Sequence, residues 1–239
     1  SLDEGNAWWS DLAARIDHDT EVPGAWGSGP LAFGSFAFDP ATSPDCSVVV
    51  VPRVLIGRQG SRSWLTVLHP AGEAPKASEL PQRHTPTAPS YPVIDDSPEQ
   101  QTAWAEQVAH LVRRLADAAN PLEKVVLARG VRVRTSAPLD TRAVVERLAE
   151  RYPTCWTFQL DGLVGASPEM LVRRQNGLVT SRVLAGTIRR RSGDAVERLA
   201  STLAQSDKDL VEHELAVASV AEALAPYCHG MNVPEVPYV

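Results

Sequence analysis

The sequence predicts an α+β fold with largely antiparallel strands, on three observations. Short apolar runs bounded by Gly and Pro cluster in the first third of the chain, as strands joined by turns do. Apolar residues recur at helical spacing in segments that lie between further strand-like runs. The pair Asn176-Gly177 separates two such runs, which is the sequence signature of a β-hairpin. Hairpin-linked strands with helices inserted between them are typical of this class.

The first third of the chain predicts three strands and a long connection. Residues 31–38, 47–56 and 63–68 are the strand-like runs, and the segment 57–60, with Gly at both ends, predicts a hairpin between the last two. Residues 70–98 are rich in Pro, Ala, Ser and Thr without apolar periodicity, which indicates a surface connection.

The rest of the chain alternates helical and extended patterns. The first helix opens on Ser-Pro-Glu-Gln, which combines an N-cap, a Pro at the first helical position and a capping-box Gln. The predicted helices begin at Ser97, Asp140, Asp194 and Ser206, and the predicted extended segments are 124–134, 154–160, 170–174 and 178–184.

Composition predicts an ordinary soluble protein. With 239 residues and 44% hydrophobic content, the chain can form one large domain or two small ones. The longest apolar runs, such as 48–51, fall far short of the roughly 20 residues of a membrane-spanning helix. The start resembles no secretory signal, so we expect the cytoplasm, and Ser1 in place of Met indicates a trimmed N-terminus.

Charge and cysteines exclude some functions. A net charge of -6 argues against nonspecific nucleic-acid binding, so an anionic substrate would need locally focused cations or a metal ion. Cys46, Cys155 and Cys228 are odd in number and scattered, which fits neither a disulfide framework nor a zinc site. We interpret them as reduced thiols.

Two segments offer acid–base groups. In the predicted strand 124–129, Lys124 shares a face with apolar residues, and a poorly solvated lysine can act as a base near neutral pH. The segment 165–169, Gly-Ala-Ser-Pro-Glu, reads as a rigid turn that opens a strand and aims Glu169 into a cleft as a general acid. Taken alone, each segment is more often explained by the simpler reading: a lysine that snorkels at the start of a strand, and a tight turn with an exposed glutamate.

Two further segments suit a metal ion and an anion. On a helix, Asp209 and Glu212 lie one turn apart on a face of small residues, which leaves room for hydrated Mg²⁺. A solvated acidic helix face is the alternative. Gly186 lets backbone approach a ligand, and Thr187 offers a hydroxyl and an amide; the arginines at 189–191 read as a solvated loop.

In order along the chain, KVVLAR, GASPE, LAGT and KDLVEHEL resemble the chorismate-utilising enzyme family, and GPLAFGSFAFDP resembles its N-terminal region. The resemblance implies two large, mostly antiparallel β-sheets packed together with helices outside, and an active site in a cleft. It also implies that residues 1–239 form a single chorismate-binding domain that is incomplete at its C-terminus. Family members continue beyond Val239, so we expect little turnover by these residues alone.

The resemblance also assigns roles residue by residue. Lys124 would activate water for attack at C2 of chorismate, and Glu169 would protonate the departing C4 hydroxyl. Glu212 matches a ligand of Mg²⁺, with Asp209 tied to the metal's water shell. Ala185, Gly186 and Thr187 match residues that line the substrate.

Two positions select within the family. Enzymes that add ammonia to make anthranilate typically lack a lysine at the place of Lys124, and aminodeoxychorismate synthases typically carry a lysine where Ala185 stands. Water is therefore the expected nucleophile, as in isochorismate and salicylate synthases. The EHEL form of the metal helix is more similar to isochorismate synthases of siderophore or menaquinone pathways, and we expect a monomer. Salicylate synthase and a non-catalytic fragment or scaffold of the same fold remain as alternatives.

Overall fold

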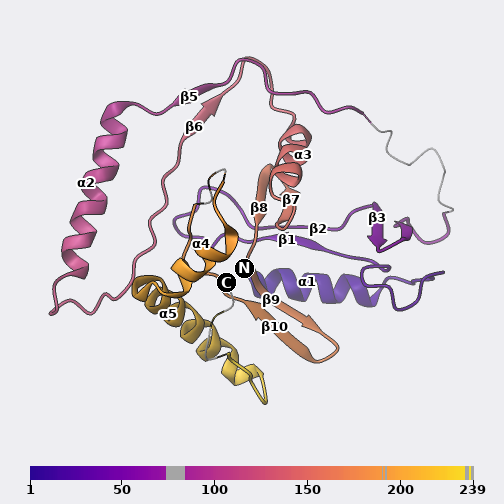
Figure 1. Ribbon diagram of the computed structural model, residues 1–239. Helices are drawn as coiled ribbons and strands as arrows, with labels where there is room; N and C mark the ends of the chain where they lie inside the picture. The colour runs from indigo at the N-terminus through magenta and orange to yellow at the C-terminus, as the bar shows by residue number, and fades with distance from the viewer. Residues whose placement is uncertain (74–83, 190, 192, 235–236, 238–239) are drawn as a thin grey trace. The chain divides into compact units, whose positions relative to one another are not determined.

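The computed structural model describes residues 1–73, 84–189, 191, 193–234 and 237, and these confirm the α+β class (Figure 1). The elements in chain order are α1 (Leu2–Ala14), β1 (Phe33–Ser35), β2 (Val48–Val50), β3 (Val54–Gln59), β4 (Arg62–Val67), β5 (Val93–Asp95), α2 (Pro98–Leu115), β6 (Arg132–Arg134), α3 (Thr141–Arg151), β7 (Trp156–Leu160), β8 (Leu163–Ser167), β9 (Met170–Gln175), β10 (Leu178–Arg182), α4 (Val196–Ala204), α5 (Asp207–Leu224) and a 3₁₀ turn, Ala225–Tyr227.

The strands pair in twos. The sheets of the described residues are β1–β2, β3–β4, β5–β6, β7–β8 and β9–β10, and four of these pairs have an antiparallel register. These sheets are smaller than the two large sheets that the resemblance implies. The chain divides into two compact units, which are described separately: unit 1 contains residues 1–88, 140–148 and 157–165, and unit 2 contains 89–139, 149–156 and 166–239.

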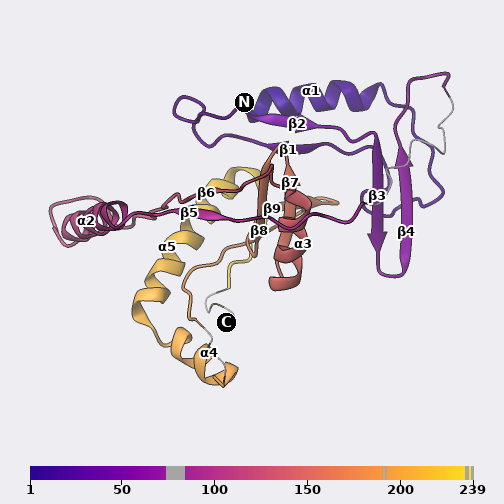
Figure 2. The same cartoon turned by 90° about the horizontal axis from the view of Figure 1, so that it is seen from above.

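In unit 1, helix α1 lies along the β1–β2 pair (Figures 1 and 2). Gly5 allows this approach, because a Cβ on it would lie 3.0 Å from Phe36 Cε1 and 3.1 Å from Val49 Cγ2. The helix begins with a capping box between Ser1 and Glu4. The Ser-x-x-Glu spacing is typical of a helix start, and we predicted no helix over these residues.

The predicted hairpin of unit 1 is confirmed, with Gln59 opposite Arg62 across its turn. The single strand predicted over 47–56 was wrong, because the structure has two strands there, β2 and β3. Pro52 lies between them, and proline has no N–H to give to a strand ladder.

In unit 2, α2 begins as predicted at Ser97, whose side chain forms a capping box with Gln100. The strand predicted over 124–134 was wrong for residues 124–131, which the structure leaves as irregular backbone. Only β6 is a strand, and it pairs with β5, which lies inside the segment that we predicted to be a surface connection. Residues 74–83 of that connection lie outside the described residues.

The β9–β10 hairpin and the last helix of unit 2 are confirmed. In the hairpin, Asn176 at φ 50° and Gly177 at φ 80° form the two-residue turn. Two successive left-handed residues are typical of type I′ hairpins. Helix α5 begins after Ser206, whose hydroxyl accepts a hydrogen bond from the Asp209 N–H at 3.4 Å.

Close packing is sparse in the described residues. Ala143, 7% exposed, is their one buried apolar side chain. Large apolar side chains on the strands stay exposed, among them Leu171 at 78% and Leu178 at 69%. None of the described helices is both long and apolar enough to span a bilayer.

Candidate active site

The residues singled out from the sequence all lie in unit 2. They come from four places: the irregular segment 124–131, the connection between β8 and β9, the irregular segment 183–189, and the first turns of α5. Contacts within the unit join these places in pairs.

The first contact joins the candidate base to the candidate metal ligand. Lys124 Nζ lies 3.7 Å from Glu212 Oε1, and the two side chains are 30% and 34% exposed. A second ammonium, that of Lys208, lies 4.0 Å from Glu212 Oε2 and 3.8 Å from Asp209 Oδ1. Two lysine ammonium groups therefore lie within 4.0 Å of the carboxylates of Asp209 and Glu212.

The second contact joins the candidate substrate segment to α5. Gly186 has φ +79°, and a Cβ on it would lie 3.1 Å from Asp209 Cβ and 3.3 Å from Leu203 Cδ1. The lack of a side chain thus lets the backbone of 185–187 rest against the start of α5. Ala185 is half-buried there, and Thr187 is exposed.

The third contact involves Glu169. Its Oε1 accepts a hydrogen bond from the Leu184 N–H at 3.4 Å, so this carboxylate lies beside the backbone that leads into Ala185. Our interpretation of 165–169 as one turn was wrong, because β8 continues through Ser167. The connection is shorter, and the Ser167 hydroxyl accepts a hydrogen bond from the Glu169 N–H at 3.2 Å.

Together these contacts form a continuous path from Lys124 to Glu169. It runs through Glu212 to Asp209, one turn away on α5, then through Gly186 and Leu184. None of the hydrogen bonds or ion pairs found among the described residues joins Lys124 to Glu169 directly. An amine at one end of this path can take a proton from a bound ligand or water, and a carboxyl group at the other end can give one.

The carboxylates of Asp209 and Glu212 suit a hydrated divalent ion. Both are hard oxygen donors, both lie on the same face of α5, and Mg²⁺ is commonly held by one or two carboxylates while it keeps several waters. No cluster of three or more metal-ligating side chains was found in the part of the chain that the structure describes. The remaining ligands would be water or substrate oxygen.

One ion pair near the site was missed by sequence reasoning. Arg129, at the end of the Lys124 segment, pairs through Nη2 with Asp96 Oδ1, and Asp96 also accepts from Gln101 Nε2 at 3.2 Å. Asp96 directly precedes the Ser97 cap of α2. Arg129 thus ties the irregular segment to the start of a helix, a pairing across 33 positions that no local pattern indicates.

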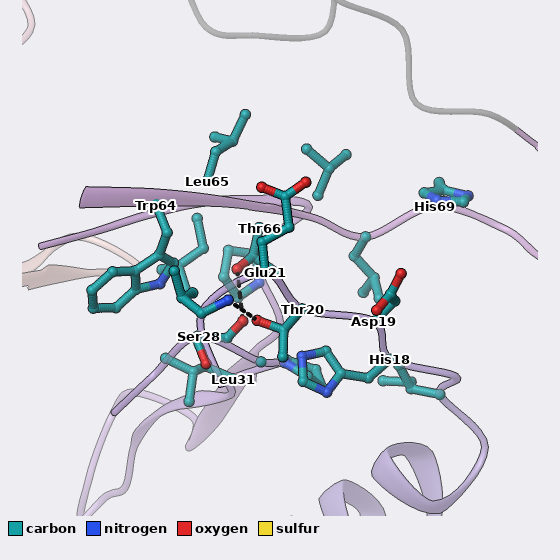
Figure 3. Close-up of a pocket in the computed structure, with 18 of the residues that line it drawn as sticks. His18, Asp19, Thr20, Glu21, Ser28, Leu31, Trp64, Leu65, Thr66 and His69 are labelled. Atoms are coloured by element: carbon teal, nitrogen blue, oxygen red, sulfur yellow. Dashed lines mark hydrogen bonds between the residues drawn. The ribbon is translucent and has the colours of Figure 1, made fainter. Parts of the chain in front are cut away.

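A cavity of about 650 Å³ lies in unit 1, away in sequence from every predicted site residue (Figure 3). The Trp64 indole N–H donates to Gly27 O at 3.2 Å at its edge, and the Thr66 hydroxyl donates to Ser28 O at 3.2 Å. Its polar lining includes His18, Asp19, Thr20, Glu21, Thr66 and His69. Sequence reasoning gave no signal for this cavity, because its walls come from separate irregular segments and a hairpin.

The chain is similar to several proteins of known family over most of its length. MenF of Mycobacterium tuberculosis is 30% identical over 223 residues, a match that covers 88% of this chain and 54% of that protein. A salicylate biosynthesis isochorismate synthase of Pseudomonas aeruginosa is 30% identical, and the match covers 94% of this chain and 53% of that protein. Among solved structures, DhbC of Bacillus anthracis matches with a TM-score of 0.58 at 30% identity, covering 87% of this chain and 51% of that one.

The chain spans about half the length of the curated relatives it matches. The family described as chorismate binding enzyme matches residues 2–239, which includes every candidate segment. The predicted family is confirmed by this match: the chain belongs to the chorismate-binding enzyme family.

Proposed function

We propose that this chain carries acid–base and metal-binding residues of an isochorismate synthase, an isomerase that converts chorismate to isochorismate. The observation that carries the proposal is the path of contacts that joins Lys124, Glu212, Asp209, Gly186 and Glu169 within unit 2. The family match and the isochorismate synthases among the relatives support it.

In the proposed reaction, Lys124 takes a proton from a water molecule as the water oxygen bonds to C2 of chorismate. The double bonds of the ring shift, and the C4–O bond breaks. Glu169 gives its proton to the departing C4 oxygen, which leaves as water. One water enters and one leaves, so the product is an isomer of the substrate. Residues 185–187 line the substrate between the two groups.

Glu212 and Asp209 would hold Mg²⁺, Glu212 directly and Asp209 through the water shell. When bound, the metal supplies positive charge for a carboxylate of the substrate, which a chain of net charge -6 otherwise lacks. Residues 1–239 would act as one chorismate-binding region of a cytoplasmic, monomeric enzyme, in a siderophore or menaquinone pathway.

The second candidate is a salicylate synthase, which forms isochorismate and then eliminates pyruvate. One relative is named for salicylate biosynthesis, although the activity in its name is isochorismate synthase, so the final product has to be tested directly. Release of pyruvate, followed with lactate dehydrogenase, separates the two: isochorismate synthase activity releases none. A non-catalytic scaffold would show neither product and no magnesium-dependent binding of chorismate.

The decisive experiment follows the oxygen atom. A polypeptide of the relatives' length that contains this chain is incubated with chorismate and Mg²⁺ in H₂¹⁸O, and the product is analysed by chromatography and mass spectrometry. We expect isochorismate with one ¹⁸O at C2. Product without the label would refute water addition. Residues 1–239 alone should give little turnover, and robust turnover would contradict that expectation.

A further inference from the structure

Glu212 is flanked by two ammonium groups, one on each carboxylate oxygen. Lys124 Nζ lies 3.7 Å from Oε1, and Lys208 Nζ lies 4.0 Å from Oε2. Lys208 also lies 3.8 Å from Asp209 Oδ1. Two single positive charges therefore surround the carboxylates that would bind a divalent cation, and their sum equals the charge of that cation.

We propose that Lys124 and Lys208 are internal counter-ions of the metal ligands, and that a divalent cation displaces the Lys124 ammonium from Glu212 and so frees it to act on substrate. This inference rests on the proposed function, because it takes Glu212 as a metal ligand and Lys124 as the base. It adds an order of events: the metal binds before Lys124 can reach its working position.

The two lysines differ in how strongly they compete. Lys124 and Glu212 are both about one-third exposed, whereas the Lys208 side chain is 85% exposed. Water screens an exposed pair more than a half-buried one, so Lys124 contributes more of the competing charge. Lys208 lies nearer to Asp209, at 3.8 Å, than to Glu212, at 4.0 Å.

The backbone makes Lys124 the partner that moves. Glu212 and Asp209 are fixed on the first turns of α5, an 18-residue helix. Lys124 lies in the irregular segment 121–131, which belongs to no strand, so its displacement breaks no ladder of backbone hydrogen bonds. Arg129 is held by Asp96 at the far end of the same segment. The backbone at Lys124 can therefore move while the Arg129–Asp96 ion pair stays in place.

A direct titration tests the proposal without any turnover. Manganese(II) chloride is the probe, because carboxylate and water ligands suit Mn²⁺ as they suit Mg²⁺, and electron paramagnetic resonance reports the free ion. The proteins are a polypeptide of the relatives' length that contains this chain, as the wild type, and its Lys124→Met, Lys124→Arg, Lys208→Met and Glu212→Gln variants. Methionine keeps most of the length of lysine and removes its charge, and arginine keeps the charge.

We expect Lys124→Met to bind Mn²⁺ about two- to fivefold more tightly than the wild type, the scale of one partly exposed ion pair. Lys124→Arg should bind within about twofold of the wild type, and Glu212→Gln should lose most of the binding. Lys208→Met should tighten binding less than Lys124→Met does.

Thermal unfolding gives a second readout. Without metal, Lys124→Met should have a lower Tm than the wild type, because Glu212 loses its nearer counter-ion. With saturating Mn²⁺ the difference in Tm should shrink, since a ligand bound to the folded state stabilises it. Equal Mn²⁺ affinity in the wild type and Lys124→Met would overturn this inference and leave the metal site standing. Absence of Glu212-dependent binding in every protein would overturn both the inference and the proposed metal site.

Discussion

Lys124 Nζ lies 3.7 Å from Glu212 Oε1, so the amine and the metal ligand, 88 positions apart in the sequence, are direct neighbours. Sequence reasoning treated these two groups as separate parts of a site. Their contact means that a substitution at one changes the electrostatic surroundings of the other, and the effects of changing both should not add.

Loss of the Lys124 amine should abolish water addition. In a polypeptide of the relatives' length, we expect Lys124→Ala to lower kcat at least about 100-fold, the usual scale of a general base. The circular dichroism spectrum should stay that of the parent. Glu214→Gln is the matched control, because Glu214 is an exposed carboxylate of the same helix, and it should retain full activity. An active Lys124→Ala protein would remove Lys124 from the proposed role.

A methyl group at position 186 should push the substrate segment away from α5. Gly186→Ala combines a left-handed backbone with a Cβ only 3.1 Å from Asp209 Cβ, so we expect a loss of roughly 2 kcal/mol or more of unfolding free energy in urea. Gly177→Ala has nearly the same φ but nothing within 4 Å of the added Cβ, so it isolates the backbone strain. Equal losses in the two variants would show that the close contact with Asp209 costs nothing.

The ion pair of Arg129 should stabilise unit 2. We expect Arg129→Gln to lower the unfolding free energy by about 1–2 kcal/mol, because the partner carboxylate is about one-quarter exposed and loses a charged donor. Arg132→Gln removes an exposed arginine from β6 and should change stability little. A double-mutant cycle with Asp96→Asn measures the coupling, and a coupling near zero would contradict the pairing.

Acid should reveal the role of Asp140 at the start of α3. The Arg142 guanidinium, with the Thr87 N–H at 3.0 Å, holds the pKa of this carboxyl well below its usual range. A lowered folded pKa stabilises the protein above the unfolded value of about 3.9, and that contribution is lost as pH falls further.

The gap in Tm between the wild type and Asp140→Asn should therefore be largest above about pH 5 and narrow toward about pH 2. In the Arg142→Gln variant, the fall of Tm in acid should begin at a higher pH than in the wild type. The substitution removes the main group that lowers the pKa of Asp140. A gap that stays constant with pH would show that the ionised form of Asp140 gives no special stability.

Local signals carried the sequence predictions that the structure confirms. The cap at Ser97 and the turn at Asn176-Gly177 act within a few residues, so their elements formed where they were expected. The segment after Lys124 was mispredicted because its alternating pattern resembles a strand, whereas a strand also needs a neighbour to complete its ladder. The family match confirms the family and leaves the roles of Lys124 and Glu169 as proposals.

The contacts that bring the candidate site together could not be predicted from any one segment. Glu169 meets the Leu184 N–H, and Gly186 meets Asp209, through a hairpin and two irregular segments that set their positions. The order of the motifs indicated a shared site, but only coordinates show which residue contacts which.

The β9–β10 pair has a practical consequence for anyone who produces this polypeptide. Each of its strands has one free edge among the described residues, and Leu171 and Leu178 face solvent. Open strand edges beside apolar side chains recruit other chains into intermolecular sheets. We expect residues 1–239, expressed alone, to accumulate as inclusion bodies or soluble aggregates unless dilution, low temperature or a solubilising fusion keeps the chains apart.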